Sequence, residues 1–256
     1  MRQDFPSLAR RAAASEKETR PPEGTVVYAI GDIHGRADLL GELQAKIRTD
    51  AGAREGPRKV IVYLGDYVDR GLQSREVLDR LLDETLPGFL SVPLKGNHEE
   101  ALLKFLDDID IAPGWFSYGG DTTLYSYGVE VPRPPLTAEK LLGTQAEFLR
   151  KLPNRHLAFL RGLRLYHEEG DYYFAHAGAR PGRALGDQAE EDLLWIRDEF
   201  LFSAYDFGKI IVHGHTIAPD PEFQPNRIGI DTGAFASGRL TCLVLDGAER
   251  QILQTG

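Results

Sequence analysis

Side chains that bind metal ions recur beside glycine at five places in this sequence. The five motifs are GDIHG (31–35), GDYVDRG (65–71), GNHEE (96–100), HAG (176–178) and GHT (214–216). Their metal-binding candidates are Asp32, His34, Asp66, Asn97, His176 and His215. Carboxylate, imidazole and amide groups without a thiolate suit first-row ions such as manganese, iron or zinc. Six ligands are too many for one ion that also binds substrate, but they suffice for two ions sharing a carboxylate, an arrangement suited to phosphoryl transfer.

Each motif directly follows a short apolar segment that predicts a β-strand. These five segments span residues 25–30, 59–64, 89–94, 171–176 and 209–214, and two further strands are predicted at 227–231 and 240–245. Ligands of open α/β sheets bind at the carboxyl ends of the strands. We therefore expect the motif residues to converge at one edge, where the glycines permit tight turns and close approach.

The segments between the first three strands have the apolar spacing of helices. Residues 39–50 and 74–85 predict two helices, so the chain begins with a βαβαβ unit of an α/β fold. From about 100 to 165 the pattern changes to a helical insert, a candidate lid, with helices at 99–108, 138–152 and 156–163 and a loop at 115–128. The aromatic residues expected in the core of this insert are Trp115, Phe116, Tyr118, Tyr125 and Tyr127.

The N-terminal segment differs from the rest of the chain. Residues 1–24 mix charges, alanines and prolines, so we expect a disordered or weakly helical arm before a single domain at 25–256. No stretch approaches the ~20 apolar residues of a membrane span, and no export signal is recognisable. The single cysteine, Cys242, excludes an intramolecular disulfide. We expect a cytoplasmic protein.

The charge balance limits the classes of partner. The net charge of −9 disfavours broad binding to nucleic acid or to an anionic membrane. An anionic substrate would have to be attracted by local arginines or bound cations. The sequence leaves the oligomeric state open.

In this order and at these positions, the five motifs resemble those of the calcineurin-like metallophosphoesterase superfamily. The DRG at 69–71 is similar to that of its phosphoprotein phosphatases, the bacterial and phage-type serine/threonine protein phosphatases. The resemblance runs from about residue 25 to 245. It implies a layered sandwich of two β-sheets flanked by helices, with a helical lid insert.

The resemblance also implies a role for each metal-binding candidate. Asp32 and His34 match the ligands of a first metal, and Asp66 matches the carboxylate that bridges both metals. The positions that match ligands of the second metal are Asn97, His176 and His215. Two divalent ions are implied, with manganese expected and iron or zinc as alternatives.

Four further residues match positions that bind phosphate or transfer a proton. His98 matches the general acid, and Asp69 matches the carboxylate that orients it. Arg70 matches an arginine that binds the phosphate, and the segment WIRDEF resembles the one that carries a second such arginine, here Arg197.

The function implied is a phosphomonoesterase in which a metal-bridging hydroxide attacks phosphoserine or phosphothreonine, with phosphotyrosine included if the lid leaves a deep cleft. The substrate would be a phosphorylated protein or a small phosphorylated molecule. A dinucleoside polyphosphate hydrolase of the diadenosine tetraphosphate type remains an alternative. Ile217, where many diesterases of the superfamily have histidine, disfavours a phosphodiesterase, and the complete ligand set disfavours a metal-free pseudoenzyme. The sequence does not identify the substrate or the native metal.

Overall fold

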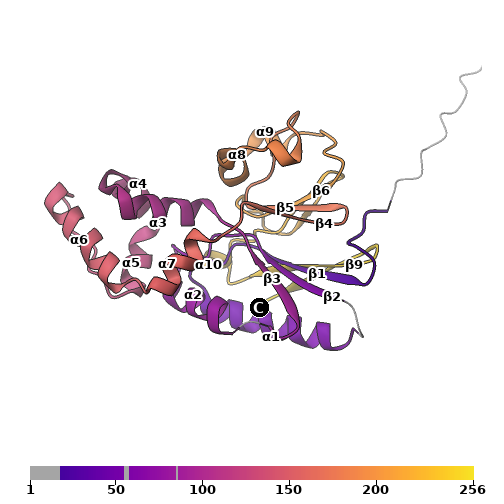
Figure 1. The fold of residues 1–256 in the computed structure, drawn as a ribbon, viewed down its shortest axis with the longest axis horizontal. Helices are drawn as coiled ribbons and strands as arrows, with labels where there is room; N and C mark the ends of the chain where they lie inside the picture. Colours follow the sequence, from indigo (N-terminus) through magenta and orange to yellow (C-terminus); the bar gives the residue numbers. More distant parts are fainter. Residues whose placement is uncertain (1–17, 55–57, 85) are drawn as a thin grey trace, which may run out of the picture.

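The computed structural model describes residues 18–54, 58–84 and 86–256, and these form two five-stranded sheets (Figure 1). The first sheet has the strand order β10-β9-β1-β2-β3. Its strands are β1 (Thr25–Ile30), β2 (Arg58–Tyr63), β3 (Phe89–Pro93), β9 (Thr241–Asp246) and β10 (Glu249–Gln254). The second sheet has the order β4-β5-β6-β8-β7. Its strands are β4 (Tyr166–Glu169), β5 (Tyr172–Ala175), β6 (Ile210–His213), β7 (Glu222–Phe223) and β8 (Arg227–Gly229).

The predicted βαβαβ unit is confirmed in the first sheet. β1, β2 and β3 are parallel neighbours, and the connecting helices are α1 (Ala37–Gly52) and α2 (Ser74–Asp83). β9 and β10 complete the sheet as antiparallel strands. The central strands of the second sheet, β5, β6 and β8, are also parallel. Parallel strands bring the segments that follow them to a common edge.

Alternating side chains of the central strands build the layers of the fold. Val27 of β1 and Phe174 of β5 belong to one buried apolar cluster, so the two sheets pack face to face. On its other face β1 directs Tyr28 into a cluster with Leu40 of α1. The second sheet is covered on its outer face by α8 (Glu190–Trp195) and α9 (Asp198–Leu201), whose Phe200 packs with strand residues. The predicted sandwich of two sheets flanked by helices is confirmed.

The insert is more helical than we predicted. Its helices are α3 (Asn97–Asp107), η1 (Ile109–Ile111), α4 (Ala112–Ser117), α5 (Gly120–Ser126), α6 (Ala138–Lys151) and α7 (Asn154–Arg161), which extend away from the first sheet (Figure 1). The loop predicted at 115–128 is therefore wrong, because two short helices occupy it. Trp115 and Tyr127 pack in the aromatic core of the insert, whereas Tyr118 and Tyr125 are exposed.

The described end of the N-terminal segment contacts the second sheet. The backbone N–H of Arg20 donates to the Asp171 carboxylate at 3.0 Å, and the backbone N–H of Asp171 donates to the Arg20 carbonyl at 2.9 Å. Residues 18–24 are thus held by contacts that the expected arm did not include. The remainder of that arm, residues 1–17, lies outside the described residues. No helix in the described part of the chain has the length and apolar character needed to cross a membrane.

Candidate metal centre

All six predicted metal ligands are buried where the strands of the two sheets end. Those that follow the first sheet are Asp32, His34, Asp66 and Asn97, and those that follow the second sheet are His176 and His215. The site therefore lies at the junction of the two sheets, as the parallel strands predict.

Asp66 is the centre of this group. His34, Asp66 and His98 form one cluster whose ligand atoms lie within 4.8 Å of one another, and Asp66, His176 and His215 form a second. The Oδ2 atom of Asp66 is 3.4 Å from His34 Nε2, and its Oδ1 atom is 3.5 Å from His176 Nε2. Each carboxylate oxygen thus faces a different imidazole, as a bridging ligand requires.

Of the other two candidates, Asn97 lies beside the ring nitrogens of two histidines, and Asp32 contacts the backbone of one. Asn97 Oδ1 lies 2.8 Å from His176 Nε2 and 2.9 Å from His215 Nδ1. The carboxylate of Asp32 accepts a hydrogen bond from the backbone N–H of His215 at 3.0 Å. Asp32 is not a member of the His34 cluster, in which His98 is the third residue.

His34 and His215 are arranged to present unprotonated nitrogens. His34 Nδ1 is 2.9 Å from the Val68 carbonyl, which leaves Nε2 directed at Asp66. The Nε2 atoms of His34 and His215 are buried, and within the described chain no group forms a hydrogen bond with them. Burial lowers the pKa of His34 to about 3 and that of His215 to about 2. Neutral imidazoles with free nitrogens are the form that binds metal, so these residues fit two divalent ions.

The buried carboxylates of the site also fit a bound cation. Burial raises the pKa of Asp32 well above its usual value, and the nearby carboxylates of Asp231 and Asp66 raise it further. For Asp66, burial opposes the charged form, whereas positive charge on the surrounding imidazoles, that of His176 foremost, lowers its pKa. A bound cation reverses the cost of collecting buried carboxylates.

The backbone around the site is held in an unusual conformation. Among the described non-glycine residues, positive φ angles occur at His34 (45°), Asp66 (52°), Asp69 (70°), Arg70 (67°) and His215 (63°). All five are predicted site residues. Such conformations cost roughly 1–3 kcal/mol each and persist where the surrounding structure enforces them, which is typical of functional sites.

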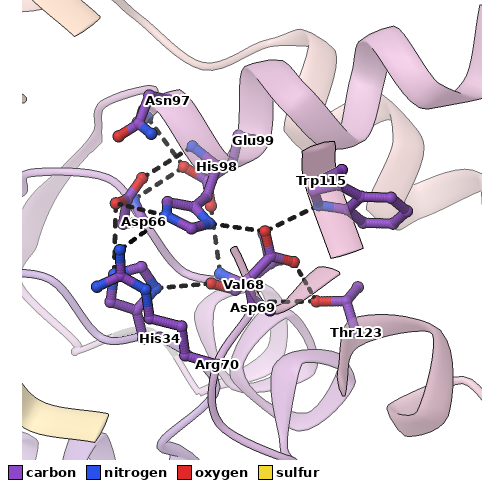
Figure 2. A network of polar contacts seen from close by, with 12 residues as sticks. His34, Asp66, Val68, Asp69, Arg70, Asn97, His98, Glu99, Trp115 and Thr123 are labelled. Atoms are coloured by element: carbon purple, nitrogen blue, oxygen red, sulfur yellow. Dashed lines mark hydrogen bonds and ion pairs between the residues drawn. The ribbon is translucent and has the colours of Figure 1, made fainter. Parts of the chain in front are cut away.

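His98 lies beside the metal cluster and pairs with Asp69 (Figure 2). His98 Nδ1 is 2.7 Å from Asp69 Oδ2, and His98 Nε2 is 3.3 Å from the Arg70 guanidinium. Burial lowers the pKa of His98, but the carboxylates of Asp66 and Asp69 outweigh burial and raise this pKa to about 8. The structure thus brings His98, Asp69 and Arg70 together.

Arg197 approaches the other end of the site. It lies at the start of α9 with an exposed side chain, and its Nη1 donates to the hydroxyl of Thr216 at 3.2 Å. Thr216 follows His215 directly. Arg70 and Arg197 therefore stand near the His98 and His215 ends of the cluster, respectively.

Sequence reasoning missed Glu99, which organises the motif containing Asp66. Its carboxylate accepts backbone N–H groups from Asp66 at 2.8 Å, Tyr67 at 2.7 Å and Val68 at 3.2 Å, and from Gly96 at 2.9 Å. An acidic residue three positions after a helix N-cap is a recognisable capping signal. That signal, GNHE, was present in the sequence but predicts only a local bond to Gly96.

Three more residues that we did not assign touch the predicted machinery. Trp115 and Thr123 of the insert donate hydrogen bonds to Asp69 (Figure 2). The ring of Phe235 lies 4.8 Å from the guanidinium carbon of Arg70, within the range of a cation–π contact. No local pattern in the sequence indicated these contacts.

A cavity of about 310 Å³ adjoins the site on the side of His98. Apolar and aromatic side chains form much of its wall, including Trp115, Tyr118, Ile111 and Trp195. Its basic side chain, Lys104, is paired at 2.9 Å with Glu100 of the same wall. The cavity therefore offers apolar contact beside the proton donor candidate and little positive charge.

Comparisons with known proteins identify relatives in sequence and in fold. Residues 25–229 match the family model described as calcineurin-like phosphoesterase. Serine/threonine-protein phosphatase 2 of Salmonella typhimurium is 30% identical over 225 residues, covering 84% of this chain and 90% of that protein. Bis(5'-nucleosyl)-tetraphosphatase PrpE of Anoxybacillus flavithermus is 26% identical over 234 residues, covering 84% and 88%. The solved structure of a candidate diadenosine tetraphosphatase superposes with a TM-score of 0.61 at 22% identity, covering 92% and 96%.

Proposed function

The chain belongs to the calcineurin-like phosphoesterase family, and from this membership we propose that it is a binuclear-metal phosphomonoesterase acting on phosphorylated proteins. Its relatives and its buried His/Asp clusters support a metal-dependent phosphoesterase. The observation that carries the proposal is the Asp66 carboxylate, which two clusters of metal-binding side chains share.

The proposed ligands divide around Asp66. Asp32, His34 and Asp66 would hold a first metal, and Asp66, Asn97, His176 and His215 would hold a second, all of them buried. When bound, two such ions supply an activated water nucleophile and neutralise charge on the phosphoryl group. We expect manganese to support activity, with iron and zinc as alternatives, because this set of nitrogen and oxygen ligands does not select one ion.

The remaining proposed residues bind the phosphate and deliver a proton. In this proposal Arg70 and Arg197 bind its non-bridging oxygens, for which a planar guanidinium is suited. His98 has Nδ1 bound to Asp69, so its proton on Nε2 is directed toward the site. In that position His98 acts as the general acid that protonates the departing oxygen.

The cavity beside His98 favours a phosphorylated side chain as the substrate. A leaving group on the His98 side would contact the aromatic wall of the cavity. The polyphosphate chain of a nucleotide would instead need several cations to bind it. Lys104 is already paired with Glu100, and Asp110 adds another acidic group to the lining. The net charge of −9 also disfavours the binding of a polyphosphate chain.

A dinucleoside polyphosphate hydrolase is the second candidate. A relative of similar identity is named as such a tetraphosphatase, and the exposed rings of Tyr118 and Trp195 at the cavity offer stacking partners for a nucleobase.

One comparison tests the choice between these substrates. Peptides carrying phosphoserine, phosphothreonine or phosphotyrosine are assayed beside diadenosine tetraphosphate, with manganese supplied. We expect a higher kcat/KM for a phosphopeptide. If diadenosine tetraphosphate is cleaved at least tenfold more efficiently, about 1.4 kcal/mol in transition-state binding, the second candidate is correct.

A further inference from the structure

The carboxylate of Asp69 is surrounded by three side-chain donors (Figure 2). Its Oδ2 atom lies 2.7 Å from His98 Nδ1 and accepts the indole N–H of Trp115 at 2.8 Å. Its Oδ1 atom accepts the hydroxyl of Thr123 at 2.6 Å. Asp69 is completely buried, and these contacts fix the plane of its carboxylate.

Trp115 and Thr123 come from a different part of the fold than Asp69 and His98. Asp69 and His98 follow β2 and β3 of the first sheet, whereas Trp115 belongs to α4 and Thr123 to α5 of the insert. The insert also binds the backbone of the same loop, because the N–H of Arg70 donates to the Gly119 carbonyl at 3.2 Å. The insert is therefore fastened to the predicted acid–base residues by side chain and by backbone.

The geometry has a chemical consequence for His98. A histidine ring is oriented by the group that its other nitrogen binds, and a loosely held partner lets the ring turn. Trp115 occupies one lone-pair direction of Asp69 Oδ2, which leaves the other for the bond to His98 Nδ1.

We propose that Trp115 and Thr123 are positioning residues that act through Asp69 on the proton transfer by His98. This inference rests on the proposed function. The insert then completes the acid–base apparatus, in addition to forming the wall of the cavity.

Packing alone is the competing explanation. Trp115 lies in the aromatic core of the insert, 4.8 Å from the ring of Phe105, and its removal would disturb that core. A purely structural role predicts lower stability and an equal loss of rate on every substrate. A positioning role predicts a loss that depends on the leaving group.

Thr123→Val gives the sharper test because it removes the hydroxyl and keeps the volume. The backbone N–H of Asp69 donates to the hydroxyls of both Thr123, at 2.9 Å, and Ser74, at 3.1 Å, so Ser74 remains as its partner when the Thr123 hydroxyl is removed. We expect kcat on a phosphoserine peptide to fall about 10- to 100-fold, the usual scale for losing such a supporting contact. We expect KM to stay within twofold and the loss on p-nitrophenyl phosphate, whose leaving group needs little protonation, to be much smaller.

Two controls test whether the loss of rate comes from the hydroxyl of Thr123. Thr123→Ser retains a hydroxyl and should recover most of the rate. Thr144→Val removes the hydroxyl of another buried threonine of the insert, in α6, and should leave both substrates unaffected. Trp115→Phe should reproduce the leaving-group dependence of Thr123→Val, with the melting temperature recorded for each variant.

A double substitution completes the test. If Thr123 acts through His98, Thr123→Val should reduce the rate by less than twofold in a His98→Asn background. A full additional loss in that background, or equal losses on serine and aryl phosphates, would overturn the inference. Failure of the proposed function itself is distinct, because the unmodified protein with manganese would then prefer diadenosine tetraphosphate or hydrolyse neither phosphate ester.

Discussion

Asp66 gives the most direct test at the scale of single residues. Because both ligand clusters share its carboxylate, Asp66→Asn should weaken the binding of both ions together. Metal content after purification with manganese, measured by mass spectrometry, checks this. Asp38→Asn, at an exposed carboxylate paired with Arg36, is the control and should retain full metal. Loss of only one ion would show that Asp66 does not bridge.

His98 should separate proton transfer from metal binding. His98→Asn is expected to leave the metal content nearly intact while kcat on alkyl phosphates falls ~10²–10⁴-fold, the range for losing a general acid. The loss should be smaller for p-nitrophenyl phosphate. Equal losses on the two substrate classes would contradict the role proposed for His98.

Phe235 should affect the binding of phosphate through Arg70. Its half-buried ring lies under the guanidinium and also packs edge-on against His34, 5.6 Å between ring centres. A cation–π contact of this kind contributes about 0.5–1 kcal/mol, so Phe235→Leu should weaken inhibition by inorganic phosphate roughly two- to fivefold. Phe223→Leu, on an exposed strand of the second sheet, should leave the inhibition constant unchanged.

At the scale of elements, the turn between α4 and α5 depends on glycine. Gly119 has φ of 98°, and a Cβ there would lie 2.7 Å from the backbone nitrogen of Arg70. Gly119→Ala should therefore displace this loop and reduce both stability and activity. Gly143→Ala is the matched control, because Gly143 lies within α6 with open space around it. It should stabilise the protein by roughly 1 kcal/mol in urea unfolding, with activity unchanged.

The elements that the sequence predicted well have strong local patterns. β1 and β2 are buried along most of their length, and α1 and α2 have a regular apolar face. β4, β10 and the pair α4 and α5 were missed. β4 reads YHEE and β10 reads ERQILQ at edges of the sheets, so neither has an apolar run. α4 and α5 are each a few residues long and separated by Gly119, which is too short for a helical period to be recognised.

The residues of the candidate site that could be predicted are also those that stand next to a strong local pattern. Asp32, Asp66 and His215 each follow an apolar strand and a glycine, which is visible in the sequence. Trp115 and Thr123 have no such signal, because their contacts with Asp69 arise only when the insert packs on the first sheet. Residues that support a site across elements are found from the structure.

At the scale of the whole molecule, the proposed metal ligands lie at the junction of the two sheets. The buried apolar cluster between the sheets does not include the ligands, so the fold should survive removal of the metal. Chelation should abolish activity on an aryl phosphate, manganese should restore it, and the far-ultraviolet circular dichroism should be retained. Metal at 100 times its Kd adds about 2.7 kcal/mol, so the melting temperature should rise by roughly 5–10 °C. Full turnover after stripping would contradict the two-metal proposal.

The strand order of the first sheet has a consequence for how the chain folds. β1 lies between β2 and β9, so Val26 is opposite Lys59 on one side and Asp246 on the other. The β1–β2 pairing closes a short loop, whereas the β1–β9 pairing joins nearly opposite ends of the chain, and such distant pairings form slowly. Pulse-labelling hydrogen exchange during refolding should therefore show protection of the β2 amides before those of β9. The nascent chain would carry an unpaired edge on β1 until β9 arrives, which makes the βαβαβ half the segment most exposed to aggregation during synthesis.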